Sequence, residues 1–225
     1  MSTPSLKYVF PSTGHCGSKY IAVMVSTAGI PCGHERTFNA GISWHYVRTG
    51  RFIAESSAFA APYLDTPICR EAKIIHIVRH PLNVIRSWLY GTGKWGERAM
   101  PFFVEHLQGG LWADKRWGVP LEAGVTSEKN PDWLAGLYIA WNKMIEMRGR
   151  GRVCKAEDGP KLLQWIPESN DDQVFDDRHY HSHSKKKDFL DWDIVKHDAL
   201  RGELKDLCLE YGYKEDPSAA LPEGI

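Results

Sequence analysis

The sequence has no segment of the kind that directs a chain into a membrane or to export. Its first residues, Met1 to Ser5, carry no basic start followed by an apolar run. Nor does any later stretch approach the ~20 consecutive apolar residues that a spanning helix needs. These features predict a soluble, cytoplasmic protein with no membrane insertion.

Cysteine is scarce and unpatterned. The five cysteines are an odd number without a CxxC pair, which argues against a disulfide framework and against a zinc ribbon. A second possible metal-binding pattern is the alternation of His179, His181 and His183. Because no fourth ligand is evident beside them, we expect no metal site and no metal requirement.

An excess of charge of either sign is also missing. Lys plus Arg and Asp plus Glu both count 28, so no overall charge attracts nucleic acid or an anionic membrane, and any anion site must be local. With 225 residues, 43% of them hydrophobic, the chain is expected to form a single domain over residues 1–225.

The sequence does contain two strand–turn–helix patterns. The first is a short apolar strand at Lys7 to Pro11, followed by a helix from Ser18 to Ala28 that Gly29 ends. In the second, the β-branched run Lys73 to Val78 precedes a helix from Pro81 to Tyr90. Proline fits the first helical position because its missing N–H has no partner there.

Further elements continue the alternation of strands and helices, which predicts an α/β fold with a parallel sheet. They are an amphipathic helix at Pro131 to Met147, a strand at Arg152 to Ala156, a short helix at Pro160 to Ile166 and a closing helix at Leu200 to Tyr211. The segments from Gly91 to Lys129 and from Glu168 to Lys187 lack periodicity and are expected to be loops or lids.

The turn after the first strand has the composition of an anion site. Gly14 and Gly17 allow successive backbone N–H groups to converge, and Ser18 and Lys19 add a hydroxyl and a cation. The turn is not a Walker A loop, because Ser18 separates Gly17 from Lys19 and Tyr20 stands where the magnesium-binding hydroxyl would be. The alternative is a plain strand-to-helix connection capped by Ser18.

The turn after the second strand supplies further groups that bind anions. Arg79 follows the strand, Pro81 opens the helix, and Ser87 comes eight residues after Arg79. An arginine can bind a phosphate through two parallel hydrogen bonds, while the hydroxyl reaches the same anion from the helix. Two anion sites suit a ligand phosphorylated at two places.

Both turns resemble those of the sulfotransferases that use 3'-phosphoadenosine 5'-phosphosulfate. In that family a [KR]-S-G-T-[TK]-[WY] turn binds the 5'-phosphosulfate, and R-[NHD]-P with a later serine binds the 3'-phosphate. The resemblance implies a three-layer α/β/α fold of the P-loop nucleoside triphosphate hydrolase type, with adenosine 3',5'-bisphosphate as the product. The implied nucleotide contacts are Gly14, His15, Cys16, Gly17, Ser18, Lys19, Tyr20, Arg79, Ser87, Lys185 and Lys186.

The resemblance also implies catalytic roles. Lys19 and a protonated His15, which stands where the family has Lys or Arg, would stabilise the charge on the leaving oxygen. Glu35 would be the base that accepts a proton from the acceptor, a small molecule or a carbohydrate, with His34 and Glu55 as alternatives. Tyr20 would stack on adenine or pack in the core. The competing functions are a P-loop-type kinase and a non-catalytic nucleotide-binding relative.

Overall fold

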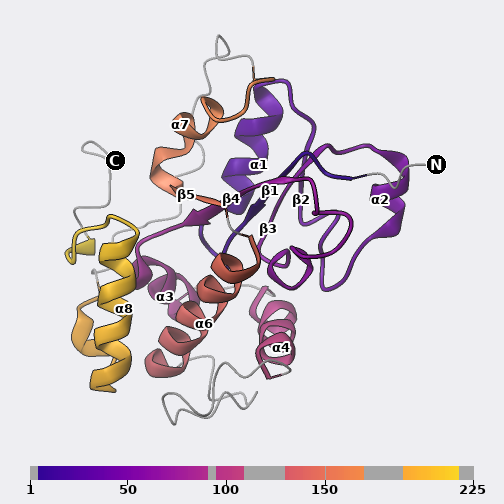
Figure 1. Cartoon of the computed structure of the whole chain (residues 1–225). Helices are drawn as coiled ribbons and strands as arrows, with labels where there is room; N and C mark the ends of the chain where they lie inside the picture. The colour runs from indigo at the N-terminus through magenta and orange to yellow at the C-terminus, as the bar shows by residue number, and fades with distance from the viewer. Residues whose placement is uncertain (1–4, 91–94, 109–129, 150, 170–189, 218–225) are drawn as a thin grey trace. The chain divides into compact units, whose positions relative to one another are not determined.

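The structure is a computed structural model, and it describes residues 5–90, 95–108, 130–149, 151–169 and 190–217. The chain divides into two compact units. The first comprises Met1–Val78, Ile145–Lys187 and Gly224–Ile225, and the second comprises Arg79–Met144 and Asp188–Glu223. The first unit contains the sheet and the described part of the second is helical (Figure 1). A single domain over residues 1–225 stays a prediction.

The first unit is built on a five-stranded sheet in which all neighbouring strands are parallel. In spatial order the strands are β2 (Cys32–His34), β3 (Ala54–Ser57), β1 (Tyr8–Pro11), β4 (Lys73–Val78) and β5 (Arg152–Lys155). The predicted α/β class with a parallel sheet is therefore confirmed.

Strand β1 occupies the centre of this sheet, where the direction of the chain reverses. From β1 the chain passes to β2 and β3 on one side, and β4 then lies on the other side of β1. An isolated parallel bridge between Ser12 and Ile77 continues the pairing of β1 with β4. Ligands of open α/β sheets bind at such a reversal, beyond the carboxyl ends of the strands. The turn after β1 lies at this point.

Helix α1 (Ser18–Thr27) covers the sheet because its apolar residues recur at helical spacing. Tyr20, Ile21, Met24 and Val25 are all buried. The helix ends before Gly29, which adopts a left-handed backbone with φ 87° that glycine reaches without strain.

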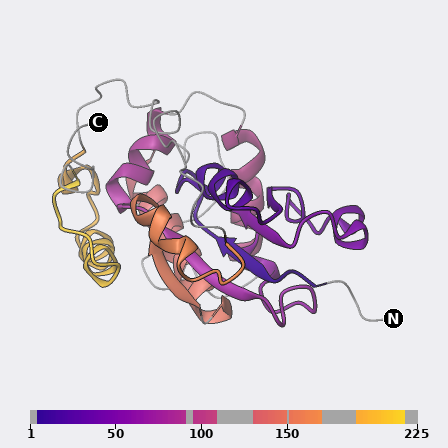
Figure 2. The same cartoon turned by 90° about the horizontal axis from the view of Figure 1, so that it is seen from above.

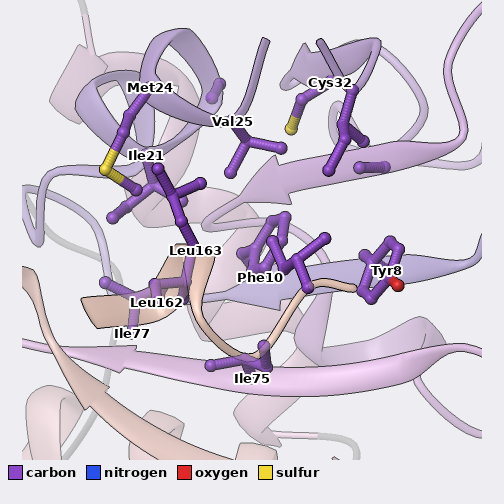
Figure 3. Close-up of a cluster of buried hydrophobic side chains, with 14 of the residues drawn as sticks. Tyr8, Phe10, Ile21, Met24, Val25, Cys32, Ile75, Ile77, Leu162 and Leu163 are labelled. Carbon is purple, nitrogen blue, oxygen red and sulfur yellow. The ribbon is translucent and has the colours of Figure 1, made fainter. Parts of the chain in front are cut away.

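Helix α7 (Gly159–Leu163) lies beside α1 on the same face of the sheet (Figures 1 and 2). Leu162 and Leu163 of α7 join Phe10 of β1 and Ile77 of β4 in one core with the apolar side of α1 (Figure 3). This core fixes the orientation of α1, and so of the turn that precedes it.

The second unit contains α3 (Pro81–Tyr90), α4 (Trp95–Gln108) and α8 (Asp198–Glu210), together with most of α6 (Pro131–Gly149). Aromatic contacts join α4 to α6: the ring centroids of Phe103 and Trp141 are 4.2 Å apart. The Asn130 side chain caps the start of α6, because it accepts a hydrogen bond of 2.9 Å from the backbone N–H of Asp132.

The predicted elements that follow the two strand–turn–helix patterns are confirmed, with bounds that differ by a few residues at their ends. The expected loop from Gly91 to Lys129 is wrong in part, because α4 (Trp95–Gln108) occupies much of its first half. Pro101 lies inside that helix, and a proline usually ends or kinks a helix, which made the helical pattern hard to read. Strand β2 and the short helix α2 (Trp44–Thr49) were also missed. No helix in the described part of the chain has the length and apolar character needed to cross a bilayer.

Candidate functional site

The turn after β1 presents the start of α1 without a capping side chain. Gly17 is the N-cap, with a left-handed backbone at φ 84°, and no side chain caps the helix. The backbone N–H of Cys16 donates to the Thr13 carbonyl at 3.2 Å, which closes the turn. Ser18 is thus the first residue of α1 rather than its cap, and the opening N–H groups suit an anion.

Two hydroxyls at the carboxyl end of β1 strengthen this reading. Ser12 and Thr13 are fully buried, and neither side-chain oxygen has a hydrogen-bond partner among the described residues. A buried hydroxyl without a partner costs free energy, on the order of 1–3 kcal/mol. An anion bound in this turn would accept hydrogen bonds from such groups, so their placement fits a phosphate or sulfate group.

Ser18, His34 and Glu35 are close together at the start of α1. Ser18 Oγ lies 3.1 Å from His34 Nε2, and His34 Nε2 lies 3.9 Å from Glu35 Oε1. The backbone N–H of Glu35 donates to the Ser56 carbonyl at 3.2 Å, which ties it to β3. The structure therefore brings the predicted base Glu35, and its alternative His34, to the predicted anion site.

His34 is uncharged at neutral pH. Burial, followed by the positive charges of Lys19 and Arg36, lowers the pKa of His34 to about 4. Its approach to Glu35 is therefore not an ion pair at neutral pH, although the distance alone would qualify as one. A neutral imidazole can accept a hydrogen bond from a hydroxyl or donate one, so His34 can orient either Ser18 or Glu35.

The backbone at two of the predicted catalytic residues is unusual. His15 has φ 64° and Glu35 has φ 52°, both in the left-handed region that residues with a side chain seldom adopt. Such conformations cost on the order of 1–3 kcal/mol and gather at functional sites. The observation supports a role for both residues without assigning one.

Glu55, the other alternative base, is in a different environment. It is fully buried in β3, and its Oε1 accepts hydrogen bonds from the backbone N–H groups of Arg36, at 2.6 Å, and Thr37, at 3.1 Å. Burial raises its pKa to about 7, against the opposing effect of these bonds. Glu55 thus holds the segment that follows β2, which favours a structural role over proton transfer.

Tyr20 is 8% exposed and belongs to the core beneath α1. A Cβ atom added to Gly159 would lie 2.6 Å from Cε1 of its ring, so the ring packs directly against the start of α7. Of the two predicted roles of Tyr20, core packing agrees with this burial.

The predicted phosphate-binding residues of the second turn lie in the second unit, around the start of α3. The Arg79 carbonyl accepts a hydrogen bond of 2.7 Å from the Tyr138 hydroxyl, which fixes the backbone of Arg79 to α6. Burial, and then the charge of Arg79, lowers the pKa of Arg86. The charge of Arg79 therefore acts on the guanidinium of Arg86, and two cations that act on each other's surroundings favour a bound anion.

Other predicted residues lie outside the described part of the chain. They include Lys185 and Lys186, expected at the 3'-phosphate, and the histidines at positions 179, 181 and 183. The described ranges contain no cluster of three or more His, Cys, Asp or Glu side chains able to hold a metal. The absence of a metal requirement stays a prediction.

Sequence reasoning missed three residues of the candidate site: Ser12, Thr13 and Arg86. The two hydroxyls directly follow the predicted strand and precede Gly14, a position that could have drawn attention to them. Arg86 lies on the predicted helix directly before Ser87, so its position next to an expected phosphate contact could have drawn attention to it.

Comparison with models of known protein families found no match, and comparison with curated proteins found none either.

Proposed function

We propose that the protein is a sulfotransferase that moves a sulfuryl group from 3'-phosphoadenosine 5'-phosphosulfate to a hydroxyl or amine of an acceptor. The observation that carries the proposal is the turn after β1. It combines an uncapped helix start, the buried hydroxyls of Ser12 and Thr13, and the side chains of Ser18, His34 and Glu35. A three-layer α/β/α, P-loop-like fold is part of this proposal.

In the first unit, the turn would hold the 5'-phosphosulfate of the donor. The N–H groups at the start of α1 and the hydroxyls of Ser12 and Thr13 supply donors to oxygens that carry negative charge. Lys19, which is exposed on the first turn of α1, supplies the cation, and His15 supplies a second one when protonated. Charge builds up on oxygens during sulfuryl transfer, so fixed donors of this kind lower the barrier.

In the second unit, Arg79 and Ser87 would hold the 3'-phosphate, with Arg86 as an additional cation. Support comes from the effect of the Arg79 charge on Arg86 and from the anchoring of the Arg79 backbone by Tyr138. A phosphate carries negative charge that both guanidinium groups attract. The residues proposed for each phosphate therefore all belong to one unit.

The chemistry assigned to the chain is an in-line displacement. The acceptor oxygen forms a bond to sulfur while the bond between sulfur and the oxygen of the 5'-phosphate breaks. The acceptor proton passes to the carboxylate of Glu35, and the phosphate oxygen leaves as an anion near Lys19. His34, neutral and beside Glu35, orients that carboxylate. No metal ion enters this scheme.

The proposal is tested by nucleotide binding and by transfer. Adenosine 3',5'-bisphosphate should raise the melting temperature, and at a hundred times its Kd a ligand adds about 2.7 kcal/mol to the free energy of unfolding. Arg79→Ala should abolish most of this stabilisation. ATP with magnesium should stabilise less, and a result in the opposite order would favour a kinase.

Transfer from the radiolabelled donor to a panel of hydroxyl and amine acceptors tests the catalytic part. Glu35→Gln should lose transfer while keeping nucleotide binding, whereas Glu71→Gln, at an exposed position, should behave as the unaltered protein. His15→Lys should keep activity and His15→Ala should reduce it, because charge is the property assigned to His15. Nucleotide binding without transfer to any acceptor would indicate a non-catalytic relative.

A further inference from the structure

A groove runs along the outer side of α1 in the first unit. Its volume is about 530 Å³, within the range of roughly 300–1,000 Å³ that small-molecule sites occupy. It adjoins the start of α1, since Lys19 lies on the first turn of that helix and His34 Nε2 lies 3.1 Å from Ser18 Oγ. The groove is lined by Lys19, Ala22, Val23, Ser26, Thr27, Cys32, Gly33, His34, Arg36 and Phe52.

The charge of this groove has one sign. Lys19 and Arg36 are its cations, and no Asp or Glu is among its lining residues. Within the described part of the chain, neither side chain takes part in an ion pair. His34 adds no charge at neutral pH because its pKa is about 4, and the two cations contribute to that low value. Both cations therefore act on the same part of the groove.

Two described acids, Glu35 and Glu55, lie close to the residues of the groove without lining it. The Glu35 carboxylate approaches His34 to 3.9 Å but does not line the groove. The buried Glu55 has one oxygen bound by the backbone N–H groups of Arg36 and Thr37 and is covered by Gly33, whose added Cβ would lie 2.1 Å from the other oxygen. Neither acid is positioned to neutralise Arg36 from within the groove.

The rest of the groove is apolar. Ala22 and Val23 of α1 and the half-buried ring of Phe52 form this part. The Phe52 ring is held from outside by Tyr46, at a centroid separation of 5.6 Å, and by the guanidinium of Arg51, 5.4 Å from its centroid. A ring fixed in this way offers a flat surface for a planar ligand.

We propose that this groove binds the acceptor, and that the acceptor is an anion: a hydroxylated molecule with a flat apolar body and a carboxylate or similar group that binds Arg36, while Lys19, at the end of the groove beside the turn after β1, interacts with the donor. That the ligand of the groove is the acceptor rests on the proposed function. That the groove binds an anion does not depend on it. Charge complementarity supports the anion site, because two cations that have no acidic partner among the described residues favour a ligand that brings negative charge.

A pair of probes that share one ring and hydroxyl but differ in charge, an acid and its methyl ester, tests the inference. 4-Hydroxybenzoate carries the carboxylate and the ring, and methyl 4-hydroxybenzoate has the same ring without the charge. Calorimetric titration should show the acid binding about tenfold or more tightly than the ester, with and without adenosine 3',5'-bisphosphate. In the transfer assay the same preference should appear as a lower KM for the acid with little change in kcat.

Charge reversal gives the matched variants. Arg36→Glu should weaken binding of the acid about tenfold or more and leave the ester unchanged. Arg48→Glu makes the same change in net charge at an exposed position outside the groove lining and should leave both probes unaffected. Equal binding of acid and ester, or equal effects of the two variants, would overturn the inference.

The two proposals fail in different ways. If adenosine 3',5'-bisphosphate does not bind while the acid still binds through Arg36, the proposed sulfotransferase function fails and the anion groove stands. If the nucleotide binds and the acid shows no preference over the ester, the groove inference fails and the proposed function stands.

Discussion

Replacing Glu55 by Gln should change how the stability of the protein depends on pH. The carboxyl group is fully buried, and only its Oε1 is hydrogen-bonded, to the backbone N–H groups of Arg36 and Thr37. Burial raises its pKa from 4.5 to about 7. Glutamine has nearly the same shape, and its amide oxygen can keep both hydrogen bonds, so the variant removes the titration while largely keeping the packing.

The magnitude follows from proton linkage. Between about pH 4.5 and 7 the folded protein keeps a proton that the unfolded chain has released, so rising pH favours unfolding. The contribution is fully present below the unfolded pKa and lost as the pH rises through the folded one. Each pKa unit corresponds to ~1.4 kcal/mol. The shift from 4.5 to about 7 therefore removes about 3 kcal/mol between roughly pH 4 and pH 8.

Urea unfolding of the unaltered protein and of Glu55→Gln, each measured across that pH range, gives the difference in the free energy of unfolding. This difference should move by about 3 kcal/mol in favour of Gln as the pH rises. Glu71→Gln, at an exposed carboxyl, should show no comparable trend. Parallel curves for Glu55→Gln and the unaltered protein would refute the account of a buried, proton-binding carboxyl.

Three further substitutions test other parts of the structure by urea unfolding. Gly33→Ala should destabilise by about 1–3 kcal/mol, because the new Cβ would lie 2.1 Å from Glu55 Oε2; unchanged stability would contradict this packing. Gly202→Ala should stabilise by about 0.5–1 kcal/mol, since nothing lies within 4 Å of the added Cβ in α8, and a loss would contradict the open surface there. Tyr138→Phe should cost about 0.5–1.5 kcal/mol by removing the hydrogen bond to the Arg79 carbonyl, so equal stability would show that this bond does not anchor Arg79.

The elements that the sequence predicted correctly are those with a strong local signal. The strand Lys73–Val78 and the helix Pro81–Tyr90 have the predicted bounds, because a β-branched run and a proline at the first helical position are local features. The short strand β2, Cys32–His34, contains a glycine and has too few residues to show a period. Its strand conformation depends on pairing with β3, a contact between distant parts of the chain.

The candidate site likewise has features that the sequence could predict and features that it could not. Gly14, Gly17, Lys19, Arg79 and Ser87 could be selected from the sequence, since spacing and residue type suffice to suggest a turn that binds an anion. Burial and contact could not be read from it. Only the folded chain shows that the Ser12 and Thr13 hydroxyls are buried without a hydrogen-bond partner among the described residues.

The acidic residues show the difference most clearly. From the sequence alone, Glu35 and Glu55 were both candidate bases, because the residue type does not show the environment of the carboxylate. Tertiary structure separated them: β3 buries Glu55 under the segment after β2, whereas Glu35 lies beside His34 at the start of α1. The sequence by itself determined the residue types and the local turns. Only packing decided which carboxylate is covered and which lies near the start of α1, because burial is set by residues far away in the chain.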